Sequence, residues 1–331
     1  MSQLITFREA IRQALFEEMA RDDRVFMMGE DIGLFGGARG VTKGLLDRFG
    51  EERVRDTPLS ETAIIGGGVG AAMSGLRPVC ELMLMGFISV CFDEIHNLAG
   101  KWTFRFSSSD PLKIPLVIRG PFGIENFGVE PHSQSPEALF IHSPGIKIAI
   151  PSTPHDAKGL LKTAIRDDGP VLFFEHSHLY DYQGPVPVDE YTVLFGQADI
   201  RREGRDVTLI AHSLMLHRAL DAAALLEQKH IEAEVIDLRT LVPLDKETIF
   251  RSIRNTGRVV IIQESYKRGG YASEIAAVIS EEIFHELKAP IVRIGAPNLP
   301  IPYSPDLIKL YRPDAATIAS VVEKVIHGQA F

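Results

Sequence analysis

Glu61 and His132 occupy positions suited to acid–base chemistry. Glu61 ends the segment 56–61 (Asp-Thr-Pro-Leu-Ser-Glu), and a glycine-rich stretch at 66–70 follows it inside an expected helix. A carboxylate at the start of a helix is stabilised by free backbone N–H groups and by the helix dipole. Taken alone, the pattern favours a structural acid at a helix N-terminus.

His132 lies in the segment 130–137 (Glu-Pro-His-Ser-Gln-Ser-Pro-Glu), after a predicted strand at 116–119 and a glycine-containing loop. Ligands of open α/β sheets gather at the carboxyl ends of the strands, so a histidine there is well placed to transfer protons. A histidine packed beside a helix N-terminus, with Ser133 or Ser135 as the cap, is the alternative. The residues by themselves favour that alternative.

Several common functional motifs are absent from the sequence. Residues 66–70 do not fit G-x-G-x-x-G and do not follow a strand, which argues against a nicotinamide-binding domain. No phosphate-binding G-x-x-x-x-G-K-[ST], no G-x-S-x-G and no H-E-x-x-H occurs. His176 and His178 have no cysteine or carboxylate at ligand spacing, so they do not indicate a metal site.

The first half of the chain alternates between strand and helix patterns, which predicts a parallel sheet covered by helices on both faces. The predicted strands are 24–28, 79–85, 116–119, 147–150 and 171–175, and the predicted helices are 7–21, 42–49, 63–74, 88–104, 135–141 and 153–166.

Residues 180–197 break this pattern with Gly184, Pro185, Pro187 and several acids, as a domain linker does. The alternation then resumes, with strands at 207–211, 233–237, 258–263 and 291–294 and helices at 214–227, 246–254, 270–287 and 315–326. We therefore predict two α/β domains, at 1–182 and 196–331, joined by a linker at 183–195.

The composition is that of a soluble globular protein. Of 331 residues, 45% are hydrophobic and 24% are charged, which excludes disorder as the main state. The net charge of −9 argues against nucleic acid and anionic membrane as partners. Cys80 and Cys91 indicate buried thiols in a reducing compartment. With no signal-peptide pattern and no apolar run of about 18 residues, we expect a cytoplasmic protein.

The order of short motifs resembles the beta subunit of the thiamine-diphosphate-dependent component of 2-oxo acid dehydrogenase complexes, a family that includes pyruvate, branched-chain and acetoin dehydrogenases. The resemblance covers essentially the whole chain. It implies a transketolase-like pyrimidine-binding domain followed by a transketolase C-terminal domain. The motifs that carry it are Met28-Gly29-Glu30-Asp31, Asp56 to Glu61, Gly75-Leu76-Arg77-Pro78, His132 to Ser135, Pro144-Gly145, Ala157 to Leu160, Ala164 to Asp167, Glu203 to Thr208, Ile236 to Leu241, Pro243 to Asp245 and Pro302-Tyr303.

The resemblance also implies roles for four side chains. Glu61 matches the glutamate that binds N1′ of the cofactor's aminopyrimidine, where a shared proton favours the tautomer that activates the thiazolium ring. Met83 and Phe87 match apolar residues that pack against the aminopyrimidine. His132 matches the histidine that faces the reacting carbon and assists proton transfer, or acyl transfer to lipoamide.

Family members often hold a monovalent cation, such as K⁺, beside the loop that matches 164–169. By resemblance, its ligands here are Leu116, Ala164, Asp167 and Gly169, mainly through backbone carbonyls. A plain turn at the end of a helix is the alternative.

The partners are also implied by the resemblance. The sequence has no Gly-Asp-Gly followed downstream by Asn, the pattern that holds Mg²⁺ and the diphosphate in thiamine diphosphate enzymes. In this family the alpha subunit holds them, and the pyrimidine half belongs to the beta subunit. We therefore expect an α2β2 heterotetramer that docks onto a lipoyl-bearing acyltransferase core through its C-terminal domain. Residues 264–270 are assigned only a structural or interface role.

Two segments depart from the family pattern, 104–112 and 122–130, and both bear on the substrate. A pyruvate dehydrogenase type is the first choice, and branched-chain 2-oxo acid and acetoin dehydrogenases remain open. The C-terminal half of a split transketolase is the nearest rival, although the loop at 132–134 offers no cation for a sugar phosphate. A scaffolding subunit without catalysis is the alternative from another class, and intact Glu61 and His132 argue against it.

Overall fold

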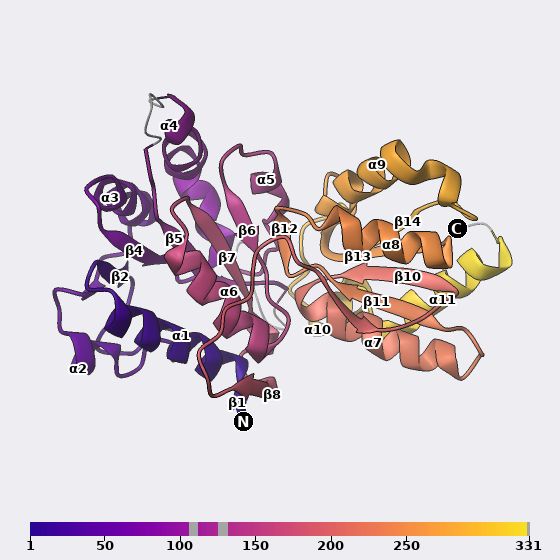
Figure 1. Cartoon of the computed structure of the whole chain (residues 1–331), viewed down its shortest axis with the longest axis horizontal. Coiled ribbons are helices and arrows are strands. Elements are labelled where there is room, and N and C mark those ends of the chain that lie inside the picture. The colour runs from indigo at the N-terminus through magenta and orange to yellow at the C-terminus, as the bar shows by residue number, and fades with distance from the viewer. Residues whose placement is uncertain (106–111, 125–131, 330–331) are drawn as a thin grey trace. The chain divides into compact units, whose positions relative to one another are not determined.

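The chain folds into two compact units. The structure is a computed structural model that describes residues 1–105, 112–124 and 132–329. The first unit comprises residues 1–122 and 139–195, and the second comprises 123–138 and 196–331 (Figure 1). The segment 123–138, which contains His132, is therefore grouped with the C-terminal residues by its contacts.

The first unit has a parallel sheet with strand order β6-β7-β5-β4-β2-β3 and helices on both faces (Figure 1). A separate antiparallel pair joins β1 to β8. In chain order its elements are β1 (Ser2–Thr6), α1 (Phe7–Arg21), β2 (Val25–Gly29), α2 (Leu45–Phe49), β3 (Val54–Asp56), α3 (Glu61–Met73), β4 (Arg77–Glu81), the 3₁₀ helix η1 (Met85–Cys91), the π-helical η2 (Glu94–Ala99), α4 (Gly100–Arg105), β5 (Val117–Phe122), α5 (Ala138–Ile141), β6 (Lys147–Ala149), α6 (Pro154–Arg166), β7 (Val171–His176), η3 (Ser177–Leu179) and β8 (Gln183–Pro187).

The second unit has a five-stranded sheet of order β14-β13-β10-β11-β9, in which only the edge strand β9 is antiparallel to its neighbour. Its elements are β9 (Asp199–Arg202), β10 (Val207–Ala211), α7 (Ser213–Glu227), β11 (Ala233–Asp237), β12 (Thr240–Val242), α8 (Lys246–Thr256), β13 (Val259–Tyr266), α9 (Tyr271–Ile283), η4 (Phe284–Glu286), β14 (Val292–Ala296), α10 (Pro305–Tyr311) and α11 (Ala315–His327). Among the described residues, no helix has both the length and the apolar character needed to cross a bilayer.

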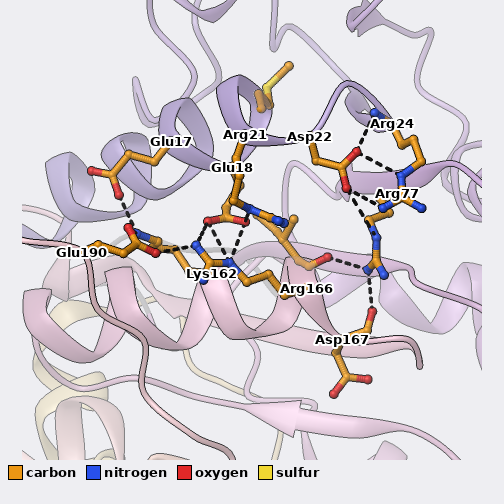
Figure 2. A network of polar contacts seen from close by, with 12 residues as sticks. Glu17, Glu18, Arg21, Asp22, Arg24, Arg77, Lys162, Arg166, Asp167 and Glu190 are labelled. Atoms are coloured by element: carbon orange, nitrogen blue, oxygen red, sulfur yellow. Dashed lines mark hydrogen bonds and ion pairs between the residues drawn. The ribbon is translucent and has the colours of Figure 1, made fainter.

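Helices α1 and α6 pack against each other in the first unit through apolar faces and through charge pairs in which one member is buried. Thr6 caps α1 by accepting the Glu9 N–H, and Thr153 caps α6 in the same way. Lys162 of α6 is fully buried and pairs with Glu17 of α1 and with Glu190 (Figure 2). A buried ammonium without a partner is strongly destabilising, so these pairs specify how the two helices meet.

The predicted fold class is confirmed, and most predicted elements lie where the sequence patterns place them. The helix predicted at 7–21 has those bounds in the structure. The strand predicted at 79–85 ends at Glu81, because the chain leaves the ladder there and turns into η1. The helix predicted at 88–104 starts as η1 and contains the π segment η2. The sequence patterns predict neither β1 nor β8.

Glycine at position 68 lets α3 lie close to β4. A Cβ at Gly68 would meet the Cys80 Sγ at 2.5 Å and the Leu116 side chain at 3.1 Å. Gly70, on the same helix, has open space at its Cβ position. The glycine-rich stretch of α3 therefore serves helix-to-sheet packing at Gly68 but not at Gly70.

We expect the substitutions Gly68→Ala and Gly70→Ala to change stability in opposite directions. Gly68→Ala overpacks the contact with Cys80 and should destabilise the chain by about 1–3 kcal/mol. Gly70→Ala, the matched control, should be neutral or stabilise by up to about 1 kcal/mol, because alanine favours the helix. Urea unfolding measures both, and equal effects would contradict the packing account.

Candidate active site

Glu61 is the first residue of α3, at the end of the helix where negative charge is favoured. The Ser60 hydroxyl before it donates to the Pro58 carbonyl at 3.0 Å and therefore does not cap the helix. The Glu61 side chain is partly exposed. The segment 56–61 thus places a carboxylate, rather than a serine cap, at the uncapped N–H groups of the first turn.

Glu30 is a second carboxyl group beside Glu61. It follows β2 directly and is only 6% exposed, and among the described residues its Oε1 has no hydrogen-bond partner. Burial raises the pKa of Glu30, and the nearby carboxylates of Glu61, Asp31 and Glu81 raise it further. Buried polar atoms normally form hydrogen bonds, so this oxygen is a candidate hydrogen-bond partner for a polar group of a ligand.

Arg119 of β5 is a buried cation near the carboxyl edge of the first sheet. Its guanidinium, 1% exposed, bonds Glu81 of β4 on one side and Glu175 of β7 on the other. The Tyr180 hydroxyl donates to Glu175 at 2.8 Å. The register pairs Glu81 with Arg119 on neighbouring strands, so parallel pairing itself brings the charges together. Burial raises the pKa of Glu81, and Arg119 opposes that shift.

Met83 and Phe87 follow Glu81 at the carboxyl end of β4. Met83 lies in the loop after the strand and Phe87 in η1, and both side chains are partly exposed. The structure therefore places these two predicted apolar residues in the same unit as Glu61, at the sheet edge where Glu30 and Glu81 lie.

His132 belongs to the second unit. Its side chain is exposed, and Ser133 next to it is fully buried. The Gly123 N–H donates to the Gln134 carbonyl at 2.8 Å, which closes the loop that carries His132. The departures predicted at 104–112 and 122–130 lie mostly outside the described residues.

The four residues predicted to bind a monovalent cation are in the first unit, and oxygens of three of them, Leu116, Ala164 and Asp167, accept hydrogen bonds from the protein. The Leu116 carbonyl accepts from Val171 at 2.9 Å, and the Ala164 carbonyl accepts from Asp167 at 3.3 Å. The Asp167 carboxylate accepts from Lys147 and from the Gly169 N–H, both at 2.7 Å.

A guanidinium also reaches this loop. Figure 2 shows Arg77 beside the end of α6, where it donates to the carbonyls of Asp167 at 2.8 Å and Ile165 at 2.9 Å. Lys147 and Arg77 therefore supply the positive charge at these oxygens. A monovalent cation at this loop stays a prediction, and no step below depends on one.

The sequence patterns missed Glu30, Arg119 and Glu175 as site residues. Each had a signal, because each is a charged residue within or directly after an apolar strand in a sheet covered on both faces. Charged residues are rarely buried there unless they are paired or functional. Arg119 and Glu175 pair with each other, whereas Glu30 Oε1 has no partner among the described residues.

Comparisons with known proteins agree over the whole chain. The family described as "Transketolase, pyrimidine binding domain" matches residues 3–183, and "Transketolase, C-terminal domain" matches residues 196–318.

Three relatives illustrate the range of similar proteins. The acetoin:2,6-dichlorophenolindophenol oxidoreductase subunit beta of Cupriavidus necator is 45% identical over 99% of each chain. The 2-oxoisovalerate dehydrogenase subunit beta of Bacillus subtilis is 48% identical over 93% of this chain and 94% of its own. The pyruvate dehydrogenase E1 component subunit beta of Rickettsia felis is 43% identical over 98% of each.

Among solved structures, a split-gene transketolase that forms an inactive beta4 tetramer superposes with a TM-score of 0.80. It is 23% identical and covers 98% of this chain and 99% of its own. At that identity the likeness concerns the fold.

The raised pKa of Glu30 predicts that Glu30→Gln stabilises the chain at neutral and alkaline pH. The unfolded glutamate ionises near its ordinary pKa, about 4.3. The folded state keeps the proton to higher pH, so wild-type stability falls as pH rises from that value through the folded-state pKa.

Thermal unfolding between about pH 4 and pH 8 measures this effect. We expect the glutamine variant to unfold at a higher temperature than wild type at pH 8, with the difference shrinking toward pH 4. Glu52→Gln, at an exposed position, is the control. An equal or lower melting temperature at pH 8 would refute the burial account of Glu30.

Replacing the buried Arg119 should lower the stability of the chain far more than replacing an exposed arginine. Arg119→Met leaves Glu81 and Glu175 buried without a counter-charge, and should cost about 3–5 kcal/mol of unfolding free energy. Arg8→Met breaks the exposed pair with Asp181 and should cost less than about 1 kcal/mol. Guanidinium unfolding of both variants tests the contrast, and similar losses would contradict it.

Proposed function

Because the chain belongs to the family of beta subunits of thiamine-diphosphate-dependent 2-oxo acid and acetoin dehydrogenases, we propose that it supplies the cofactor-activating half of such an enzyme. The proposed reaction is the oxidative decarboxylation of a 2-oxo acid with acyl transfer to lipoamide. Pyruvate is the first-choice substrate.

The observation that carries this proposal is the pair of carboxyl groups at the start of α3. Glu61 lies at the helix N-terminus, and Glu30 next to it has a buried oxygen without a partner among the described residues. Two neighbouring carboxyl groups, one partly exposed at a helix N-terminus and one buried, suit a heteroaromatic ring with both accepting and donating nitrogens. The residues present therefore fit an aminopyrimidine.

When bound, thiamine diphosphate supplies an electron-accepting thiazolium ring on which decarboxylation proceeds. The role proposed for Glu61 is to share a proton with N1′ of the aminopyrimidine. Met83 and Phe87 would offer apolar surface to the ring.

His132 is the proposed proton donor and acceptor at the reacting carbon, and it would also assist acyl transfer to lipoamide. An exposed imidazole suits this task because it can reach a substrate, and histidine is the side chain that most often transfers protons in enzymes.

The proposed partner is an alpha subunit that holds the diphosphate and Mg²⁺ in an α2β2 heterotetramer. Two observations support this assignment. The sequence lacks the Gly-Asp-Gly and Asn pattern for diphosphate and Mg²⁺. In addition, Leu34, Phe35 and Leu59 of the first unit are each more than three-quarters exposed, and Leu59 is two residues from Glu61. Such side chains are typical of surfaces that a partner covers.

The heterotetramer is proposed to dock onto a lipoyl-bearing acyltransferase core in the cytoplasm. A net charge of −9 argues against nucleic acid as a partner. The chain has similar sequence identity to relatives named as pyruvate dehydrogenase, 2-oxoisovalerate dehydrogenase and acetoin oxidoreductase subunits. All three substrates should therefore be assayed. Split transketolase activity on sugar phosphates is the alternative reaction to be tested alongside them.

The decisive experiment compares this chain alone with the chain co-expressed with a candidate alpha subunit, in the presence of thiamine diphosphate and Mg²⁺. We expect decarboxylation only in the mixture. Glu61→Gln should lower kcat by at least about 100-fold, because it removes the proton shared with the aminopyrimidine. Glu52→Gln, at an exposed position, should leave kcat unchanged.

Activity of the chain alone would contradict the shared site. A fully formed heterotetramer inactive on pyruvate, 2-oxoisovalerate, acetoin and sugar phosphates would favour the scaffolding alternative. An unchanged kcat in Glu61→Gln would remove Glu61 from the mechanism.

A further inference from the structure

Ile124 is held by the second unit through both of its backbone polar groups. Its N–H donates to Glu264 Oε2 at 3.2 Å, and its carbonyl accepts from Arg312 Nη1 at 2.9 Å. Glu264 lies near the end of β13, and Arg312 follows α10. Two side chains that are far apart in the sequence therefore hydrogen-bond to the backbone of the same residue.

Glu264 and Arg312 also face each other. Arg312 Nη1 lies 3.7 Å from Glu264 Oε1, and the two side chains are 13% and 2% exposed respectively. Burial lowers the pKa of Arg312, and the Glu264 carboxylate opposes that shift. The Ile124 side chain, 1% exposed, packs with Ile308 and Tyr311 in an apolar cluster of the same unit. The backbone of Ile124 is thus fixed by charge-assisted bonds and by packing.

This anchor is one residue from the hydrogen bond that closes the His132 loop. Gly123 donates to the Gln134 carbonyl at 2.8 Å and has a φ of +103°, which few residues other than glycine adopt. His132 lies two residues before Gln134. A single hydrogen bond therefore links the residue before Ile124 to a residue two positions after His132.

At the other end of the segment, Glu137 lies near Ser265 of β13. Glu137 is fully buried, and the hydroxyls of Ser265 and Ser135 oppose the effect of burial, which raises its pKa. Ser265 directly follows Glu264 on β13. Consecutive residues of one strand thus face both ends of the segment that contains His132.

We propose that Glu264 and Arg312 are positioning residues, which set the geometry of His132 through Ile124 and the Gly123–Gln134 hydrogen bond. This inference rests on the proposed function, because it uses the role proposed there for His132. Neither side chain is required to touch substrate or cofactor. Displacement of a catalytic group by about 1 Å can lower a rate about 100-fold, so an anchor of this kind affects catalysis.

The first test measures the anchor itself, without substrate. Amide hydrogen exchange is followed by mass spectrometry in the α2β2 enzyme carrying Arg312→Met. Peptides containing Gly123 and Ile124 should exchange at least about 10-fold faster than in wild type, because the anchored bonds open more often.

Two variants accompany this measurement. Arg205→Met is the matched control, since it breaks an exposed pair with Glu232 in the same unit. Arg312→Lys keeps the charge and should restore most of the protection.

The second test measures whether the anchor acts through His132. Arg312→Met should lower kcat about 10-fold or more while the Kd for thiamine diphosphate stays that of wild type. In a His132→Ala background the same substitution should lower kcat less than about 2-fold, because the group being positioned is already absent. Glu264→Gln should behave in the same direction.

Each result decides one point. Unchanged exchange at 123–124 in Arg312→Met would overturn the anchor. Faster exchange with unchanged kcat, or a full additional loss in the His132→Ala background, would overturn the positioning role. If the unsubstituted enzyme turns over none of the proposed substrates, the proposed function fails instead. That failure is distinguishable, because the exchange difference between Arg312→Met and Arg205→Met needs no turnover.

Discussion

The guanidinium of Arg119 determines how carboxyl groups are arranged at the carboxyl edge of the first sheet. It bonds Glu81 on β4 and Glu175 on β7, and both pairs are buried. Glu30 Oε1 has no hydrogen-bond partner among the described residues, and the pKa of Glu30 is raised by burial and by its acidic neighbours. Acidic side chains thus gather around one buried guanidinium at the edge where Glu61 begins α3, and burial opposes the ionisation of Glu30.

The ion pairs of Arg119 with Glu81 and Glu175 depend on the register of the sheet. Glu81, Arg119 and Glu175 come from three adjacent strands, β4, β5 and β7, and a shift of register in either pairing would separate a charge from its partner. Removing one member of such a pair is strongly destabilising in a protein interior. The fold and the charge pattern therefore constrain each other, and neither can change alone.

The sequence predicted the fold better than it predicted the site. Alternating apolar runs and amphipathic segments sufficed for α1 and α6, because the period of their hydrophobic residues reflects burial directly. The short pair β1 and β8 was missed, since β1 has only five residues with no clear apolar alternation and β8 carries two prolines and a glycine. Glu30 and Arg119 were missed for a different reason. Their roles depend on which residues lie side by side on adjacent parallel strands. The sequence of one strand does not reveal which strands lie next to it in the sheet.

His132 illustrates the limit most clearly. Its motif placed it in a loop at the carboxyl end of a strand, but the residues that hold this loop, Glu264 and Arg312, lie more than 130 positions further along the chain. Spacing and periodicity are local properties and cannot reveal such an anchor. The first unit carries Glu61, and the second carries His132 on the segment 123–138. Cofactor activation and proton transfer at the substrate would then depend on different units, so a substitution near Arg312 can affect one without the other.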